Sequence, residues 1–125
     1  MSRLNLLVVE DDPINILVAE KLLERYFNIH IAKSAEAAID SVTKNYFDVI
    51  LMDINLGDVQ LDGIDVMKKI RNELNINSCK IYAVTSYALF DDRERFLKEG
   101  FDAYFSKPIN KEHIIKTIKE DYALV

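Results

Sequence analysis

Four short polar segments stand directly after apolar runs in this chain, and their residue types suit chemistry on a phosphoryl group. They are Glu10-Asp11-Asp12, Asp53, Thr85-Ser86 and Lys107-Pro108. Carboxylates are ligands for a hard divalent cation, and lysine and hydroxyl groups stabilise phosphoryl oxygens. A carboxylate can also act as the nucleophile and form an acyl phosphate. If the fold brings these segments together, they predict a metal-dependent phosphoryl-transfer site.

The carboxylates in this set repel one another and therefore need a positively charged partner. Two like charges about 4 Å apart repel by about 4 kcal/mol at an effective dielectric of about 20. A divalent ion offsets that repulsion best, and an all-oxygen set suits Mg²⁺, which keeps several waters. Mn²⁺ is the alternative ion. Lys107 is a second source of positive charge, and we expect it to pair with Asp53 in the resting state.

Each polar group also has an ordinary structural role when it is taken alone. Asp12 before Pro13 suits a helix N-cap, and Glu10 and Asp11 suit solvated loop acids. Lys107 alone suits a surface lysine. The hypothesis of a shared site therefore depends on the coincidence of compatible groups at separate strand ends.

The apolar pattern alternates between short continuous runs and helical stripes. We expect strands at residues 6–9, 28–32, 49–53, 80–85 and 102–107. The expected inward stripes are Ile14, Leu17, Val18 and Leu22; Ala35, Ala38, Ile39 and Val42; Val66, Met67, Ile70 and Leu74; Leu89, Phe96 and Leu97; and Ile115, Ile118 and Tyr122. Strands that alternate with helices predict an α/β fold whose parallel sheet is covered on both faces. The stripe within residues 87–99 is the thinnest, which predicts the least firmly held helix.

The topology would place the polar segments at one edge. In an open α/β sheet, ligands bind outside the carboxyl ends of the strands, where the strand order reverses. If the strand at 6–9 neighbours the strand at 49–53, the acids that follow each of them share a cleft.

Composition narrows the class of protein. A chain of 125 residues predicts one domain, residues 1–125. Its net charge of −5 and the lack of a basic stripe argue against direct nucleic-acid binding. We see no signal-peptide pattern and no apolar run of about 20 residues, so we expect a cytoplasmic protein without a membrane partner. The one cysteine, Cys79, is expected to be a buried, unreactive thiol.

Four segments carry a family resemblance: "LLVVEDDPIN", "DVILMDINL" with "DG" downstream, "AVTSYA" and "GFDAYFSKPI". In this order they resemble the CheY-like receiver domain of two-component response regulators over essentially the whole chain. The resemblance implies a flavodoxin-like, doubly wound α/β fold, with a five-stranded parallel sheet of order 2-1-3-4-5 flanked by five helices. It implies a phosphorylatable signalling module that is not an enzyme beyond its own phosphotransfer and dephosphorylation.

The resemblance also implies partners. The phosphoryl group would come from a sensor or hybrid histidine kinase, or from a histidine phosphotransfer protein. The signal would pass through the face formed by the fourth helix, the fifth strand and the fifth helix. The output target is open, and a phosphorylation-dependent dimer is one form that the output takes in such modules.

Residue roles follow from the same resemblance. Asp53 is expected to be the phosphoacceptor, and Asp11 a direct Mg²⁺ ligand. Asn55 would contribute its backbone carbonyl to the metal, and Glu10 would reach it through water. Thr85 and Lys107 would hold the phosphoryl oxygens.

Three further expectations concern the switch and its rate. Tyr104 is expected to be the switch aromatic and to act together with Thr85, turning inward on phosphorylation. Asn55 and Tyr87 occupy the positions that tune dephosphorylation. The Lys107-Pro108 peptide bond is a candidate for the cis form, which proline makes accessible.

One segment departs from the family pattern. Members commonly read D-x-x-M-P-x-M-D-G, whereas Leu56-Gly57 stands here for Met-Pro and the loop is about two residues longer. The resemblance therefore leaves the conformation of this loop open.

Two other classes of function share part of this pattern. A haloacid-dehalogenase-type aspartyl phosphatase also uses a strand-end aspartate with Mg²⁺, but it needs a second acid where this chain has Asn55. A flavodoxin-like cofactor binder needs a Ser/Thr/Gly-rich phosphate loop after the first strand, where Glu10-Asp11-Asp12 would repel the phosphate.

Overall fold

The computed structural model describes residues 3–57, 61–86 and 92–122. The strands are β1 (Asn5–Val9), β2 (Asn28–Ala32), β3 (Val49–Asp53), β4 (Lys80–Thr85) and β5 (Ala103–Ser106). The helices are α1 (Pro13–Leu23), α2 (Ala35–Lys44), α3 (Gly63–Lys68), α4 (Asp92–Glu99) and α5 (Lys111–Asp121). A π-helical turn, Lys69–Glu73, continues α3.

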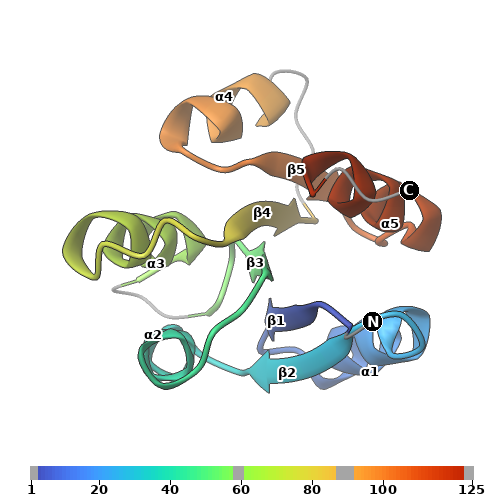
Figure 1. Ribbon diagram of the computed structural model, residues 1–125. Coiled ribbons are helices and arrows are strands. Elements are labelled where there is room, and N and C mark those ends of the chain that lie inside the picture. The colour runs from blue at the N-terminus through green and yellow to red at the C-terminus, as the bar shows by residue number, and fades with distance from the viewer. Residues whose placement is uncertain (1–2, 58–60, 87–91, 123–125) are drawn as a thin grey trace.

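The strands form one sheet in the order β2-β1-β3-β4-β5, and every neighbouring pair is parallel. This confirms the predicted fold class and strand order. The helices α1 and α5 cover one face of the sheet, and α2, α3 and α4 cover the other (Figure 1). Because β1 lies between β2 and β3, the strand order reverses at β1 and β3, and their carboxyl ends are adjacent.

Each face of the sheet has its own apolar core. On the α1 and α5 side, alternate strand residues such as Leu6 and Leu51 pack with Leu23 and Ile118. On the other side, residues such as Leu7 and Ile50 pack with the three remaining helices. Strands covered on both faces need apolar residues at every position, which accounts for their continuous apolar runs.

The predicted apolar face of α1 is wrong for three of its four residues, whereas Leu22 is partly buried and packs against the core. Ile14, Leu17 and Val18 are 72%, 55% and 40% exposed. The helix instead buries Ile16, Ala19 and Leu23. The two sets have similar helical spacing, and apolar residues occupy most positions of this helix, so its pattern does not select one face. The predicted N-cap is confirmed, because Asp12 accepts hydrogen bonds from the backbone N–H groups of Ile14 and Asn15.

The other helical stripes agree more closely with the structure. Ala35, Ala38 and Val42 are buried in α2, and Val66, Met67 and Ile70 are buried in the segment that begins at Gly63. In α5 the fully buried residues are Ile114 and Ile118, so the predicted stripe lies one residue too far along at its first position. Leu89 of the fourth stripe lies outside the described residues.

Two further expectations can be compared with the structure. Cys79 is buried, as predicted, and its burial raises the pKa of the thiol, which disfavours the reactive thiolate. No helix in the described ranges has the length and apolar character needed to cross a membrane.

Candidate functional site

Glu10, Asp11 and Asp53 bring their carboxylates together where β1 and β3 end. One oxygen from each side chain lies within 4.8 Å of the others. Glu10 and Asp53 are buried, whereas Asp11 is exposed. The neighbouring strand ends therefore produce the predicted convergence of acids.

Glu10 is held more firmly than a solvated loop acid. Its carboxylate accepts hydrogen bonds from the backbone N–H groups of Asp11 and Asp12, at 3.0 and 3.2 Å. Lys107 donates to its other oxygen at 2.5 Å. Burial acts to raise the pKa of Glu10, but the hydrogen bonds from Lys107 and its other neighbours outweigh burial and lower it. Glu10 is therefore ionised beside Asp53.

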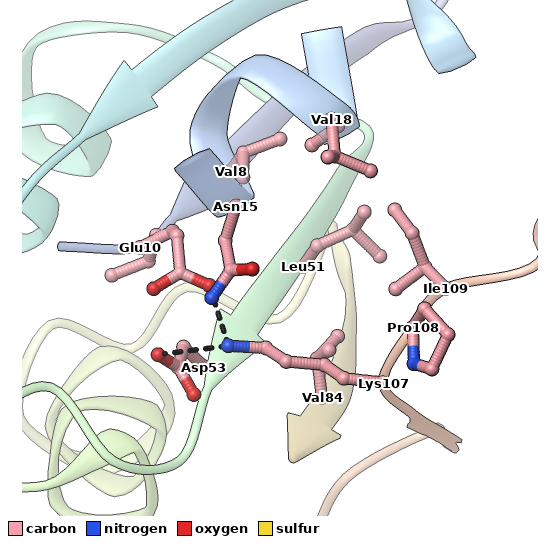
Figure 2. Close-up of a pocket in the computed structure, with 12 residues that line it drawn as sticks. Val8, Glu10, Asn15, Val18, Leu51, Asp53, Val84, Lys107, Pro108 and Ile109 are labelled. Atoms are coloured by element: carbon pink, nitrogen blue, oxygen red, sulfur yellow. Dashed lines mark hydrogen bonds and ion pairs between the residues drawn. The ribbon is translucent and has the colours of Figure 1, made fainter. Parts of the chain in front are cut away.

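The pKa of Asp53 shifts in the opposite direction to that of Glu10. The pKa of Asp53 is raised to about 7, first by burial and then by the hydrogen bond and the negative charge of Glu10. Lys107 acts against this shift from 3.3 Å, where its ammonium pairs with Asp53 Oδ2. The predicted resting pair of Lys107 with Asp53 is therefore present, but Lys107 is shared with Glu10 (Figure 2).

The third and fourth strand ends supply the remaining groups. Thr85 is buried at the end of β4, and its carbonyl accepts a hydrogen bond from the backbone N–H of Lys107 at 2.9 Å. This bond ties the end of β4 to the start of the β5–α5 connection, where the Lys107-Pro108 peptide bond is cis. The structure thus places Thr85 and Lys107 at the same edge as the acids.

The loop after Asp53 turns back over the acids. Asp53 Oδ1 accepts a hydrogen bond from the Asn55 backbone N–H, and Asn55 Oδ1 accepts one from the Gly57 N–H, each at 3.3 Å. Leu56 is buried in the core and anchors the loop. Sequence reasoning missed the proximity of Gly57 to the acids, although the glycine that replaces the usual proline was visible.

The far end of the loop is joined to its start. Gly63 donates its backbone N–H to the carbonyl of Ile54 at 2.9 Å. A Cβ on Gly63 would lie 2.3 Å from the Asp53 carbonyl oxygen, so only glycine fits this close approach. The two ends of the loop are therefore held together directly after Asp53.

Asn15 and Val18 of α1 border a pocket beside Asp53 that sequence reasoning did not identify (Figure 2). Its floor is apolar, with Val8, Leu51 and Val84 from three strands, and Ile109 closes the side opposite α1. Asn15 also borders the acidic cleft. Val18, one of the exposed apolar residues of α1, therefore borders the pocket beside Asp53.

Tyr104 lies away from the acids, on the side of β5 that faces α4. Its ring stacks on Phe96 of α4 with centroids 5.5 Å apart. Its hydroxyl is buried and has no hydrogen-bond partner among the described residues. The ring is thus already packed against α4, without first turning inward. Tyr87, the predicted partner of Asn55 in tuning dephosphorylation, lies outside the described residues.

Comparison with known proteins finds matches that cover most of this chain. The model of the family described as the response regulator receiver domain matches residues 6–119. The polar-differentiation response regulator DivK of Brucella ovis is 34% identical over 117 residues, covering 92% of this chain and 93% of that protein. The DivK protein of Brucella suis is similar to the same extent.

Solved structures agree with this comparison. A CheY-like receiver domain protein from Methanospirillum hungatei has a TM-score of 0.82 and 27% identity, covering 98% of this chain and 95% of that one. The structure of the Ssk1 receiver domain from Saccharomyces cerevisiae, crystallised with the histidine phosphotransfer protein Ypd1, matches with a TM-score of 0.82 and 28% identity. That match covers 94% of this chain and 88% of the other.

Proposed function

The chain belongs to the response regulator receiver domain family, and from that membership we propose that Asp53 accepts a phosphoryl group in a Mg²⁺-dependent reaction. The donor is a phosphohistidine on a sensor or hybrid histidine kinase, or on a histidine phosphotransfer protein. The observation that carries the proposal is the convergence of Glu10, Asp11 and Asp53, two of which, Glu10 and Asp53, also pair with Lys107.

The donor set fits a hard divalent ion. Three carboxylate oxygens within 4.8 Å of one another leave two or three negative charges to be balanced, and Lys107 supplies only one positive charge. Asp11, Asp53 and the Asn55 carbonyl would hold Mg²⁺ or Mn²⁺, and Glu10 would reach it through water. When bound, the ion neutralises charge on the oxygens of the transferred group.

Asp53 supplies the nucleophile. Its ionised oxygen forms a bond to phosphorus as the phosphorus–nitrogen bond of the phosphohistidine breaks, and the electron pair of that bond returns to the imidazole. The product is an acyl phosphate on Asp53 and a histidine that takes its proton from solvent. Lys107 and Thr85 neutralise and hydrogen-bond the oxygens of the transferred group.

The proposed output uses the α4–β5–α5 face. Thr85 moves toward the new phosphoryl oxygens, and its movement changes the packing of Tyr104 against Phe96. Because Tyr104 already lies against α4, the signal passes through this stacked pair and not through a ring that enters from solvent. Phe96 and Asp92 are the buried residues of α4, so a small change at Phe96 affects much of the helix's attachment to the core.

The exposed face of α1 supports a protein as the phosphoryl donor. Val18 borders the pocket that opens beside Asp53, and Ile14 and Leu17 are exposed apolar residues of the same helix. A phosphohistidine must approach Asp53 closely, so a donor protein has to cover the surface around it. We propose that the donor packs on these α1 residues while its histidine reaches the acceptor.

The competing phosphatase function gains no support from the geometry. That class needs a second acid two residues after the nucleophile, where this chain has Asn55. The Asn55 side-chain oxygen accepts the Gly57 N–H and serves to hold the loop.

Labelling by acetyl phosphate tests the proposed function. Incubated with Mg²⁺, the parent chain is expected to gain the mass of one phosphoryl group, removable by hydroxylamine, and Asp53→Asn to gain none. Asp40→Asn, at an exposed site on α2, is the matched control and should label like the parent. A hydroxylamine-labile phosphoryl group on Asp53→Asn would show that the acceptor assignment is wrong.

A further inference from the structure

The backbone of the loop that follows Asp53 forms one wall of the acidic cleft. Asn55 and Gly57 border this cleft together with the three carboxylates. Gly57 has a φ of +71°, in the left-handed region that residues with a side chain rarely adopt. A glycine at this point both permits the turn and leaves the wall without a side chain.

The missing side chain of Gly57 matters because of what lies beside it. A Cβ on Gly57 would be 2.9 Å from Asp11 Oδ2, which is closer than Cβ atoms approach other groups. Asp11 is exposed and its carboxylate is the far end of a flexible side chain, so that carboxylate would give way before the backbone did. With the backbone as it is here, a side chain at residue 57 would therefore displace Asp11 Oδ2 from its present position.

The position of Gly57 is itself fixed. Its N–H donates to Asn55 Oδ1, the Asn55 N–H donates to Asp53 Oδ1, and Leu56 between them is buried in the core. Hydrogen bonds and an apolar anchor thus connect the acceptor carboxylate to the residue that faces Asp11. A change at Gly57 has little room to be absorbed by movement of the loop.

We infer that Gly57 is a positioning residue of the metal site, because its lack of a side chain determines where the Asp11 carboxylate can lie relative to Asp53. The inference rests on the proposed function, in which Asp11 and Asp53 hold the ion. Groups that orient metal ligands without touching the metal typically change metal affinity by about 10-fold or more when they are altered.

Mg²⁺ titration of the full chain, followed by amide chemical shifts, tests this role without a phosphoryl donor. Gly57→Ala is expected to raise the Mg²⁺ dissociation constant on the order of tenfold. Gly57→Asn places a Cβ at the same point, but asparagine adopts the left-handed conformation more readily. It is expected to weaken Mg²⁺ binding to a similar degree, and it keeps the test open should the alanine variant fail to fold.

Gly100→Ala is the matched control. Gly100 also has a positive φ, of +124°, but its neighbour is Met67, away from the acids. This variant should lose stability and keep the Mg²⁺ affinity of the parent. A fall in affinity in both alanine variants would show that general destabilisation is the cause, and would overturn the role of Gly57.

A second measurement identifies the contact. The loss in urea midpoint caused by Gly57→Ala should shrink when Asp11 is also changed to alanine, because the clash has then lost its partner. An equal loss in both backgrounds would overturn the inference, as would a Gly57→Ala chain that binds Mg²⁺ like the parent. A parent chain that binds no Mg²⁺ would contradict the proposed function itself, which distinguishes the two failures.

Discussion

The ammonium group of Lys107 lies 2.5 Å from Glu10 Oε1 and is thereby held beside Asp53. Its distance to Asp53 Oδ2 is longer, at 3.3 Å. Lys107 is therefore shared unequally between two carboxylates that belong to neighbouring strands. A third negative group that enters the site, such as a phosphoryl group, competes with both for the same charge.

The first prediction concerns the sharing of Lys107 between Glu10 and Asp53. In Glu10→Gln the charge that repels Asp53 is gone and Lys107 is free to pair with Asp53 alone, so the pKa of Asp53 should fall. A ¹³C-carboxyl NMR titration without Mg²⁺ measures that value directly. Glu24→Gln, at an exposed position after α1, is the control and should leave it unchanged. If Asp53 titrates identically in Glu10→Gln and the parent, Glu10 does not contribute to the raised pKa.

A second prediction follows from the raised pKa of Asp53, which is about 7 in the folded chain. An unfolded aspartate titrates near 3.9, so folding favours the protonated form. The stability that this gives is complete below pH ~4 and is lost as the pH rises through about 7. Asp53→Asn lacks this loss, so its melting temperature in chelator should exceed that of the parent by at least about 4 °C at pH 8.

The same comparison near pH 4 provides the control for that prediction, because there the parent and Asp53→Asn both carry a neutral side chain. Their melting temperatures should approach each other. Mg²⁺ added at pH 8 should raise the melting temperature of the parent and leave that of Asp53→Asn nearly unchanged. A constant difference between the two chains across this pH range would contradict the assignment of the pKa to Asp53.

A third prediction tests the exposed face of α1. Leu17→Ser should slow phosphoryl transfer from a histidine phosphotransfer protein by on the order of tenfold, since interface contacts of this size contribute about 1–2 kcal/mol. Labelling by acetyl phosphate should not change, because Leu17 is 55% exposed and does not border the acceptor pocket. Tyr46→Ser, similarly exposed before β3, is the control. Equal slowing in both variants would reject a docking role for α1.

The fourth prediction separates metal binding from the switch. Lys107→Ala removes a positive charge from the acids, so Mg²⁺ should still bind. Phosphorylation of this variant should no longer perturb the amide signals of α4 around Phe96, because the phosphoryl oxygens lack one of their two proposed anchors. The parent, phosphorylated under the same conditions, supplies the reference shifts. Shifts at α4 that match the parent's would show that Lys107 does not transmit the signal.

The strands could be predicted from the sequence because burial on both faces demands an unbroken apolar run, and a run as short as 49–52 is typical of a buried strand. The inward face of α1 could not be predicted from the sequence. Ile14, Leu17 and Val18 satisfy helical spacing as well as Ile16, Ala19 and Leu23 do, and only the packing against the sheet decides between the two sets. Apolar periodicity identifies a face only where polar residues occupy the rest of the helix.

The site was predicted at the level of residue types and strand ends, and less well at the level of contacts. The pairing of Lys107 with Glu10 depends on two side-chain conformations that no sequence spacing specifies. The approach of Gly57 to Asp11 depends on the path of a loop whose length departs from the family pattern. Buried Asp92 in α4 was also not predicted, because an acid within a run of charged residues is typical of an exposed surface.

The hydrogen bond between Gly63 and Ile54 has an evolutionary consequence. This bond closes the loop between the two residues. Insertions or deletions within the loop therefore change mainly the entropy of loop closure, by about 0.6 kcal/mol for each doubling of loop length. Beyond Gly57, this segment can therefore change in length while the Asp53 backbone keeps its place. The surface next to the acids can therefore vary through the length of this loop while the acids stay where β1 and β3 end.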